Sequence, residues 1–231
     1  MDCHIGFLGK KGECAGGMMG DSLRKWWMSD YMVGSCKCKF YAILQKIYAF
    51  DKWHLGPINF KPYAREVVLM IEKYMDKNKI RFIVEVGCGL GDVIGNIKTA
   101  SNKKCQKIGI DQDGSVIKAA KLLHPSITFW QGSFDRCINK NGVCLIMINF
   151  IHMIPEEKLK EEMKKLLLEN QVDLVVMDTF SRNKNTEYLY SHNGEDLFDG
   201  KYRCIRKSKA FKAAHGAKRY IEYWEKIDKM I

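Results

Sequence analysis

Three glycines at alternate positions follow an apolar run in the stretch "VEVGCGLGD", residues 84–92. Where a strand is followed by such a turn and then by a helix, backbone N–H groups point toward a bound ligand. Glycine is needed there because a Cβ would block either the turn or the ligand. Gly87, Gly89 and Gly91 therefore predict a nucleotide-like ligand. The dinucleotide fingerprint G-x-G-x-x-G places its third glycine where this chain has Asp92.

Three carboxylates near these glycines indicate which nucleotide-like ligand the turn could bind. Asp92, at the opening of the expected helix, would repel a pyrophosphate but tolerate a ligand with an amino group and a sulfonium cation, which argues against NAD. Asp111 closes the next expected strand, "KIGID", at the distance where an acid accepts hydrogen bonds from both ribose hydroxyls, although alone it is also consistent with a turn residue or a helix N-cap. Glu85 lies in an otherwise apolar strand, where burial without a partner is costly, so a functional role is favoured.

Strands alternate with helices around these residues. We predict strands over 81–87, 107–111, 127–132, 143–150 and 172–178, and helices over 92–101, 115–124 and 155–170. This alternation implies right-handed crossovers and a parallel sheet covered on both faces. The runs 201–211 and 218–227 break the alternation and predict an antiparallel hairpin at one edge.

An amphipathic helix is expected just before the glycine strand. The segment "DKWHLGPINFKPYAREVVLMIEKYM" gives a lead rich in Pro and aromatic residues, followed by a buried stripe made of Val67, Val68, Met70, Ile71 and Tyr74. Further upstream, residues 1–20 lack a helical or strand period, whereas "SLRKWWMSDYM" and "FYAILQKIYAF" predict one or two helices that pack on the main body.

The motifs "VEVGCGLGD", "IGIDQD", "FWQGSF" and "LIMINFIHMIP" resemble a class I S-adenosylmethionine-dependent methyltransferase over roughly residues 63–231. The resemblance implies an α/β, Rossmann-like fold with a seven-stranded, mostly parallel sheet and an antiparallel C-terminal hairpin. It also implies S-adenosyl-L-methionine as the cofactor. We therefore expect an N-terminal extension or cap over 1–62, partly irregular, and a methyltransferase domain over 63–231.

The same resemblance implies where the cofactor binds. Glu85 would hold its methionine part, Asp111 its ribose, and the loop after the third strand its adenine. The implied cofactor-binding residues are Glu85, Gly87, Gly89, Gly91, Asp111, Gln112, Gly132, Ser133, Phe134 and Asn149. The family often has an acid directly after the glycine of the third-strand loop; this chain has Ser133 there, with Asp135 close enough in sequence to substitute.

Methyl transfer from a sulfonium is an in-line displacement, so the protein mainly aligns the methyl donor with the acceptor. When the acceptor is a hydroxyl group, the protein also takes up its proton. His152, after the fourth strand, is the first candidate base, and a structural histidine at a helix start is an equally consistent interpretation. His54, in "DKWHLGP", and His192, in "YSHNGED", are the other candidate site histidines, because both lie in loops that could fold over the pocket. Trp53, Phe60 and Tyr63 could stack on a flat or sugar ring of the acceptor, or pack on the helix below.

The sequence favours O-methylation of a small molecule or of a sugar or glycan hydroxyl. The "NPPY" motif, which marks many enzymes that methylate exocyclic amines, is absent after the fourth strand. An RNA methyltransferase is the alternative, since the chain has a net charge of +11 and a basic C-terminal stretch, "KYRCIRKSKAFKAAHGAKR", with interleaved aromatic residues. A non-catalytic, cofactor-binding member of the fold is the third hypothesis.

The composition suits one core with an extension, because 231 residues and 46% hydrophobic content are few for two domains. Nine cysteines in a chain of this length, with no recognisable signal peptide, indicate reduced thiols in a cytoplasmic protein. The longest apolar run is shorter than the roughly 20 residues of a membrane span. No metal site is expected, because the paired C-x2-C spacing is missing from Cys3, His4, Cys14, Cys36 and Cys38.

Overall fold

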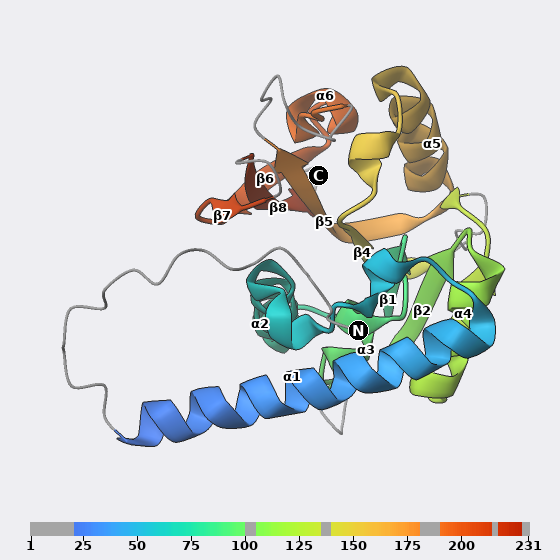
Figure 1. Cartoon of the computed structure of the whole chain (residues 1–231). Helices are drawn as coiled ribbons and strands as arrows, with labels where there is room; N and C mark the ends of the chain where they lie inside the picture. Colours follow the sequence, from blue (N-terminus) through green and yellow to red (C-terminus); the bar gives the residue numbers. More distant parts are fainter. Residues whose placement is uncertain (1–20, 100–104, 135–139, 181–189, 214–216, 228–231) are drawn as a thin grey trace.

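A central sheet with helices on both faces forms the body of the protein (Figure 1). The computed structural model describes residues 21–99, 105–134, 140–180, 190–213 and 217–227. In the part of the chain so described, no helix is both long enough and apolar enough to cross a membrane.

The strands of the sheet run in the order β3-β2-β1-β4-β5-β8-β6. Five of them are parallel: β1 (Phe82–Val86), β2 (Gln106–Asp111), β3 (Thr128–Gln131), β4 (Asn141–Met147) and β5 (Gln171–Phe180). The reversed strand β8 (Lys218–Lys226) pairs antiparallel with β5 and with β6 (Tyr202–Lys207), and the two-residue β7 (Phe211–Lys212) also pairs with β8. The predicted mostly parallel sheet and the antiparallel C-terminal hairpin are confirmed, and the short β7 makes the sheet eight-stranded where seven strands were expected.

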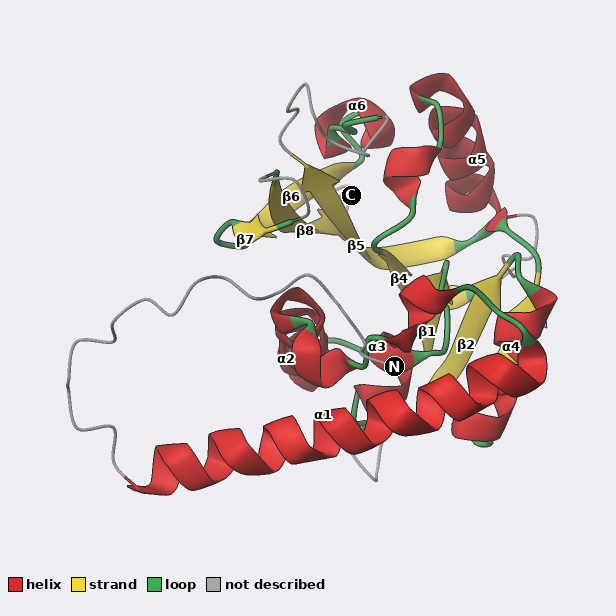
Figure 2. Ribbon diagram, in the orientation of Figure 1, coloured by secondary structure: helices red, strands yellow, loops and turns green. Residues whose placement is uncertain are grey.

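Alternate residues of the strands serve two separate cores, as the two-residue period of a strand requires. On one face, Ile83 and Ile146 pack against α2 (Pro62–Lys77), α3 (Asp92–Asn96) and α4 (Gly114–Leu123). On the other face, Val84 and Leu145 pack against α5 (Glu156–Glu169) and α6 (Gly194–Phe198). Figure 2 shows these helices on the two sides of the sheet.

The helix that precedes β1 begins as its sequence predicts. Pro62 stands in its first turn, where a missing backbone N–H is tolerated. From the predicted stripe, Val67, Val68 and Ile71 are buried, while Met70 and Tyr74 are partly buried against the same core. The helix predicted over 92–101 is shorter, because Ile97 already has an extended backbone, and residues 100 and 101 lie outside the described part.

The N-terminal extension contains one long helix, α1 (Asp21–Tyr48), and two short 3-10 helices, η1 (Lys52–Leu55) and η2 (Ile58–Phe60). Tyr41 and Leu44 of α1 form a small core with Leu90 of the glycine turn and with Val116 and Ala119 of α4. The end of α1 is thus attached to the elements that carry the glycines, as Figure 1 shows. The boundary at residue 62 stays a prediction.

Candidate functional site

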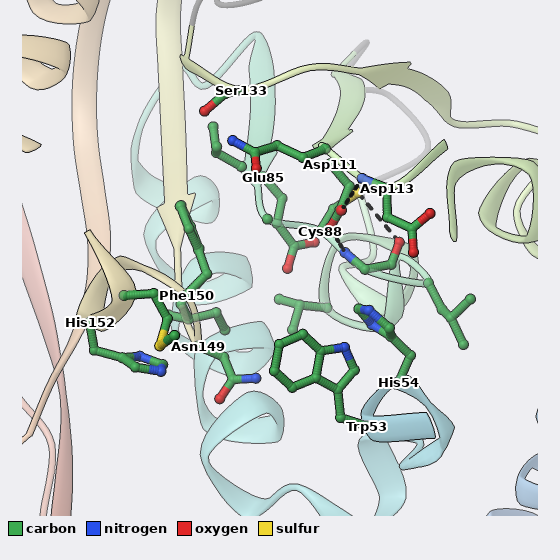
Figure 3. A pocket seen from close by; sticks show the side chains of 18 of the residues that line it. Trp53, His54, Glu85, Cys88, Asp111, Asp113, Ser133, Asn149, Phe150 and His152 are labelled. Carbon is green, nitrogen blue, oxygen red and sulfur yellow. Dashed lines mark hydrogen bonds between the residues drawn. The ribbon is translucent and has the colours of Figure 1, made fainter. Parts of the chain in front are cut away.

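The carboxyl ends of β1, β2 and β4 meet at one edge of the sheet, because Val86 is in register with Ile110 and Met147. A cavity of about 550 Å³ opens there, a size suited to a small-molecule ligand. Figure 3 shows side chains that surround it. Ten predicted site residues line the cavity: His54, Glu85, Gly87, Gly89, Asp111, Gln112, Gly132, Ser133, Asn149 and His152.

The glycine turn has a backbone that few other residues adopt. Gly87, Gly89 and Gly91 have φ angles of 69°, 53° and 77°, all in the left-handed region. A Cβ on Gly89 would come within 2.9 Å of His54 Nδ1, so this glycine lets the chain pass close beneath a ring in the cavity. Gly91 caps α3 and does not line the cavity, and a Cβ there would lie 2.8 Å from the ring of Phe129.

Asp111, at the end of β2, has its carboxylate fixed by two backbone N–H groups. Its Oδ2 accepts from Gly89 N at 2.8 Å, and its Oδ1 accepts from Asp113 N at 3.0 Å (dashed in Figure 3). Asp113 in turn caps α4 by accepting from the N–H groups of Ser115 and Val116. Each carboxylate oxygen has about two lone-pair sites, so Asp111 keeps acceptor capacity for ligand hydroxyls.

Glu85 lies in the central strand β1, near its carboxyl end, and its side chain is 3% exposed. Its Oε2 accepts one hydrogen bond, from Ile94 N at 3.0 Å. Burial raises the pKa of Glu85 to about 8, and the negative charge of Asp92 contributes in the same direction. At pH 7 this carboxyl is therefore mostly protonated, and a ligand cation placed beside it would favour ionisation.

Asp92 is also buried, and the N-terminal extension supplies its partners. Tyr41 of α1 donates a hydrogen bond to Asp92 Oδ1 at 2.7 Å, and Lys61 Nζ lies 3.9 Å from Oδ2. Burial, and then the charge of Asp92, raise the pKa of Tyr41 well above its ordinary value. Asp92 and Lys61 both line the cavity, whereas Tyr41 of α1 is not part of the lining and holds the Asp92 carboxylate from behind.

The loop after β3 contributes unequally to the cavity. Gly132 and Ser133 line it, whereas the ring of Phe134 is buried in the core below. The Phe134 ring packs at 5.9 Å from that of Phe150, and Phe150 does line the cavity. Phe134 thus supports the wall from behind, and Asp135 lies outside the described residues.

His152 lies in a 3-10 helix, η4 (Ile151–Met153), that follows β4. Its side chain is buried, and its ring centroid is 5.1 Å from that of Phe180. Burial, followed by the positive charges of Arg219 and His192, lowers the pKa of His152 to about 4. The imidazole is therefore neutral at pH 7, the form that can accept a proton.

The lead into α2 forms the opposite wall. His54 lines the cavity, and burial lowers its pKa while the charge of Asp111 opposes that shift. Trp53 is 75% exposed and makes an edge contact with His54 at 5.8 Å between ring centroids. Tyr63 also lines the cavity, whereas Phe60 packs beside α1 and is not part of the lining.

Two further groups were not identified from the sequence. Lys61 and Lys158 line the cavity, and the buried Asp178 and Arg219 lie next to Asn149. Among the described residues, no cluster of three or more His, Cys, Asp or Glu side chains could hold a metal ion. Cys3, His4 and Cys14 lie outside that part of the chain.

No protein-family model and no curated protein matches this sequence. Its fold, in contrast, is similar to that of solved methyltransferases. The small RNA methyltransferase HEN1 superposes with a TM-score of 0.56 at 16% identity, over 74% of this chain and 26% of HEN1. The N-methyltransferase NodS from Bradyrhizobium japonicum WM9 superposes with a TM-score of 0.58 at 9% identity, over 74% of this chain and 99% of NodS.

TehB from Haemophilus influenzae gives a TM-score of 0.54 at 10% identity, over 69% of this chain and 61% of TehB. At such low identities the similarity concerns the fold. The chain therefore has a methyltransferase fold, and its cavity lies at the carboxyl edge of the sheet, where ligands bind in open α/β sheets.

Proposed function

We propose that the protein is an S-adenosylmethionine-dependent methyltransferase that methylates a hydroxyl group of a small molecule or a glycan. One observation carries the proposal: Glu85, the glycines at 87 and 89, and Asp111 line one cavity of suitable size in a methyltransferase fold. Asp111 offers acceptors for ribose hydroxyls, and Glu85 offers a carboxyl for an ammonium group. The negative charge of Asp92 disfavours a pyrophosphate in the same place, and Lys61, 3.9 Å from Asp92 Oδ2, offsets part of that charge.

S-adenosylmethionine, when bound, supplies an electrophilic methyl group on a sulfonium. The chain's own contribution is alignment, together with removal of the acceptor's proton as its oxygen bonds to the methyl carbon and the carbon–sulfur bond breaks. His152 lines the cavity and follows β4, so it is our candidate for taking that proton; its pKa of about 4 leaves it neutral at pH 7 and makes it a weak base. His54 lies against Gly89 of the glycine turn and is the second candidate.

The acceptor is tested by transfer of a radiolabelled methyl group to panels of hydroxylated small molecules, glycans and amines. We expect incorporation into a hydroxylated acceptor and a large loss of it in His152→Ala. Because Phe180 packs on the His152 ring, His152→Gln is a useful second variant that preserves bulk. Methylation of amines without any hydroxylated acceptor, or full activity of His152→Ala at every pH, would refute the O-methyl assignment.

An RNA acceptor is the second candidate, favoured by the net charge of +11 and by the fold similarity to HEN1. The basic side chains of β6 weaken it, because each is close to an acid that offsets its charge. These ion pairs are Arg203–Glu225 at 2.8 Å, Arg206–Glu66 at 3.2 Å and Lys207–Glu222 at 2.7 Å. Salt-sensitive binding of RNA would favour this candidate, and its absence would exclude it.

A further inference from the structure

A buried ion pair lies behind the cavity wall at the end of β4. Asp178 of β5 and Arg219 of β8 are 1% and 5% exposed, and Arg219 Nε lies 3.4 Å from Asp178 Oδ2. A buried ion pair is weak evidence for stability, because desolvation of both charges offsets their attraction. Its placement next to the cavity suggests a different role.

The guanidinium of Arg219 is held on two sides by aromatic rings. Its Cζ lies 4.0 Å from the ring centroid of Tyr63 and 4.7 Å from that of Phe180. Such cation–π contacts limit how far a guanidinium can move. Arg219 does not line the cavity, although Tyr63 does, so the arginine is placed to act through a neighbour.

That neighbour is Asn149. Its backbone is left-handed, with a φ of 70°, and its N–H donates to Asp178 Oδ2 at 2.9 Å. Asparagine tolerates this conformation better than most residues, and the bond to Asp178 fixes it. The turn at the end of β4 is therefore held by a residue of the adjacent strand.

The side chain of Asn149 is oriented by Arg219. Asn149 Oδ1 accepts a hydrogen bond from Arg219 Nη2. Because a guanidinium can only donate, the amide must direct its oxygen to Arg219, and its NH2 group is left for other partners. Asn149 lines the cavity, and Figure 3 shows its carboxamide among the surrounding side chains.

We propose that Arg219, with Asp178, is a positioning residue that fixes the Asn149 amide as a hydrogen-bond donor for a ligand carboxylate. The inference rests on the proposed function, since the amino-acid end of S-adenosylmethionine carries one carboxylate and one ammonium group. Glu85 in the same cavity is suited to the ammonium. Glu85 would thus bind the ammonium group of the ligand, and the Asn149 amide would donate a hydrogen bond to its carboxylate.

The test is a double-mutant cycle on the binding of S-adenosylhomocysteine, measured by isothermal titration calorimetry. Asn149→Gly removes the amide while allowing the left-handed backbone, and Arg219→Lys keeps the charge opposite Asp178 but loses the planar fork. We expect each variant to bind roughly tenfold more weakly or worse. The double variant should bind no more weakly than Asn149→Gly alone, because both changes remove the same interaction, the hydrogen bond from the Asn149 amide to the ligand.

Two controls separate positioning from a general structural effect. Arg203→Lys changes an exposed arginine of β6 that pairs with Glu225, and it should leave the affinity unchanged. The analogue 5′-methylthioadenosine lacks the amino-acid end, so it should bind equally to the wild type and to every variant of the cycle. Equal losses for both ligands would overturn the proposal, as would additive losses in the cycle.

If thermal unfolding shows that Arg219→Lys does not fold, Arg219→Met combined with Asp178→Leu replaces it, since exchanging a whole buried ion pair for apolar residues is often tolerated. This pair of changes should weaken S-adenosylhomocysteine and spare the analogue; unchanged binding would refute the positioning role. Failure of the wild-type protein to bind S-adenosylhomocysteine at all would refute the proposed function itself, which keeps the two failures distinct.

Discussion

Glu85 should release a proton when the proposed cofactor, or its product S-adenosylhomocysteine, binds. With a pKa of about 8, its carboxyl is about 90% protonated at pH 7. A ligand ammonium beside it favours the carboxylate, so the pKa should fall well below 7 in the complex. Binding of S-adenosylhomocysteine at pH 7 is then expected to release about 0.9 proton per ligand, and Glu85→Gln should release none while binding more weakly.

The proton release is measured by calorimetry in phosphate, HEPES and Tris, which differ in their enthalpy of ionisation. The slope of the apparent binding enthalpy against that enthalpy gives the number of protons exchanged. Glu157→Gln, on the exposed side of α5, is the matched control and should keep the wild-type slope. A slope of zero for the wild type would refute the reasoning, because Glu85 would then not change its protonation on binding.

Three further predictions concern the unliganded protein. The pKa of Glu85 is raised from 4.5 to about 8 in the folded state, so between these pH values the native state binds a proton that the unfolded state does not. The free energy of unfolding of the wild type, relative to Glu85→Gln, should therefore fall by about 1.4 kcal/mol for each pH unit in this range. Urea titrations at several pH values measure it, and a difference that does not change with pH would contradict the prediction. Tyr41→Phe removes the hydrogen bond to the buried Asp92 and should lower the free energy of unfolding by about 1–3 kcal/mol, and an unchanged midpoint would show that the bond is unimportant. His152 should titrate near pH 4 by NMR, and its pKa should rise in Arg219→Gln; a wild-type value near 6.5 would contradict the structure.

Much of the fold followed from local patterns in the sequence. The strands and helices from residue 62 onward alternate, and the apolar stripe of α2 has a clear helical period, so the parallel sheet was predictable. The length of α3 was not predictable: Ile97, which follows its last residue, has an extended backbone and is buried in the core. A Cβ on Gly95 would collide with the His124 ring, a contact made across the fold.

The lining of the candidate site was predictable where short sequence motifs supply it, as in the glycine turn and at Asp111. Gly91 belongs to the glycine turn and Phe134 to the loop after β3, yet both lie against the core, because neighbouring residues of a turn point in different directions. The partners of Asn149 could not be inferred, since Asp178 and Arg219 come from strands that meet only when β8 pairs with β5. Such pairing is a long-range property of the sheet.

The most direct test of the central claim is calorimetric titration of the purified protein with S-adenosylmethionine, S-adenosylhomocysteine and NAD, alongside Asp111→Ala. We predict micromolar binding of the first two ligands, no binding of NAD, and loss of binding in Asp111→Ala, which should still unfold cooperatively although it loses the hydrogen bonds from Gly89 N and Asp113 N. Binding of NAD alone, or S-adenosylhomocysteine binding that is unaffected by Asp111→Ala, would contradict the account.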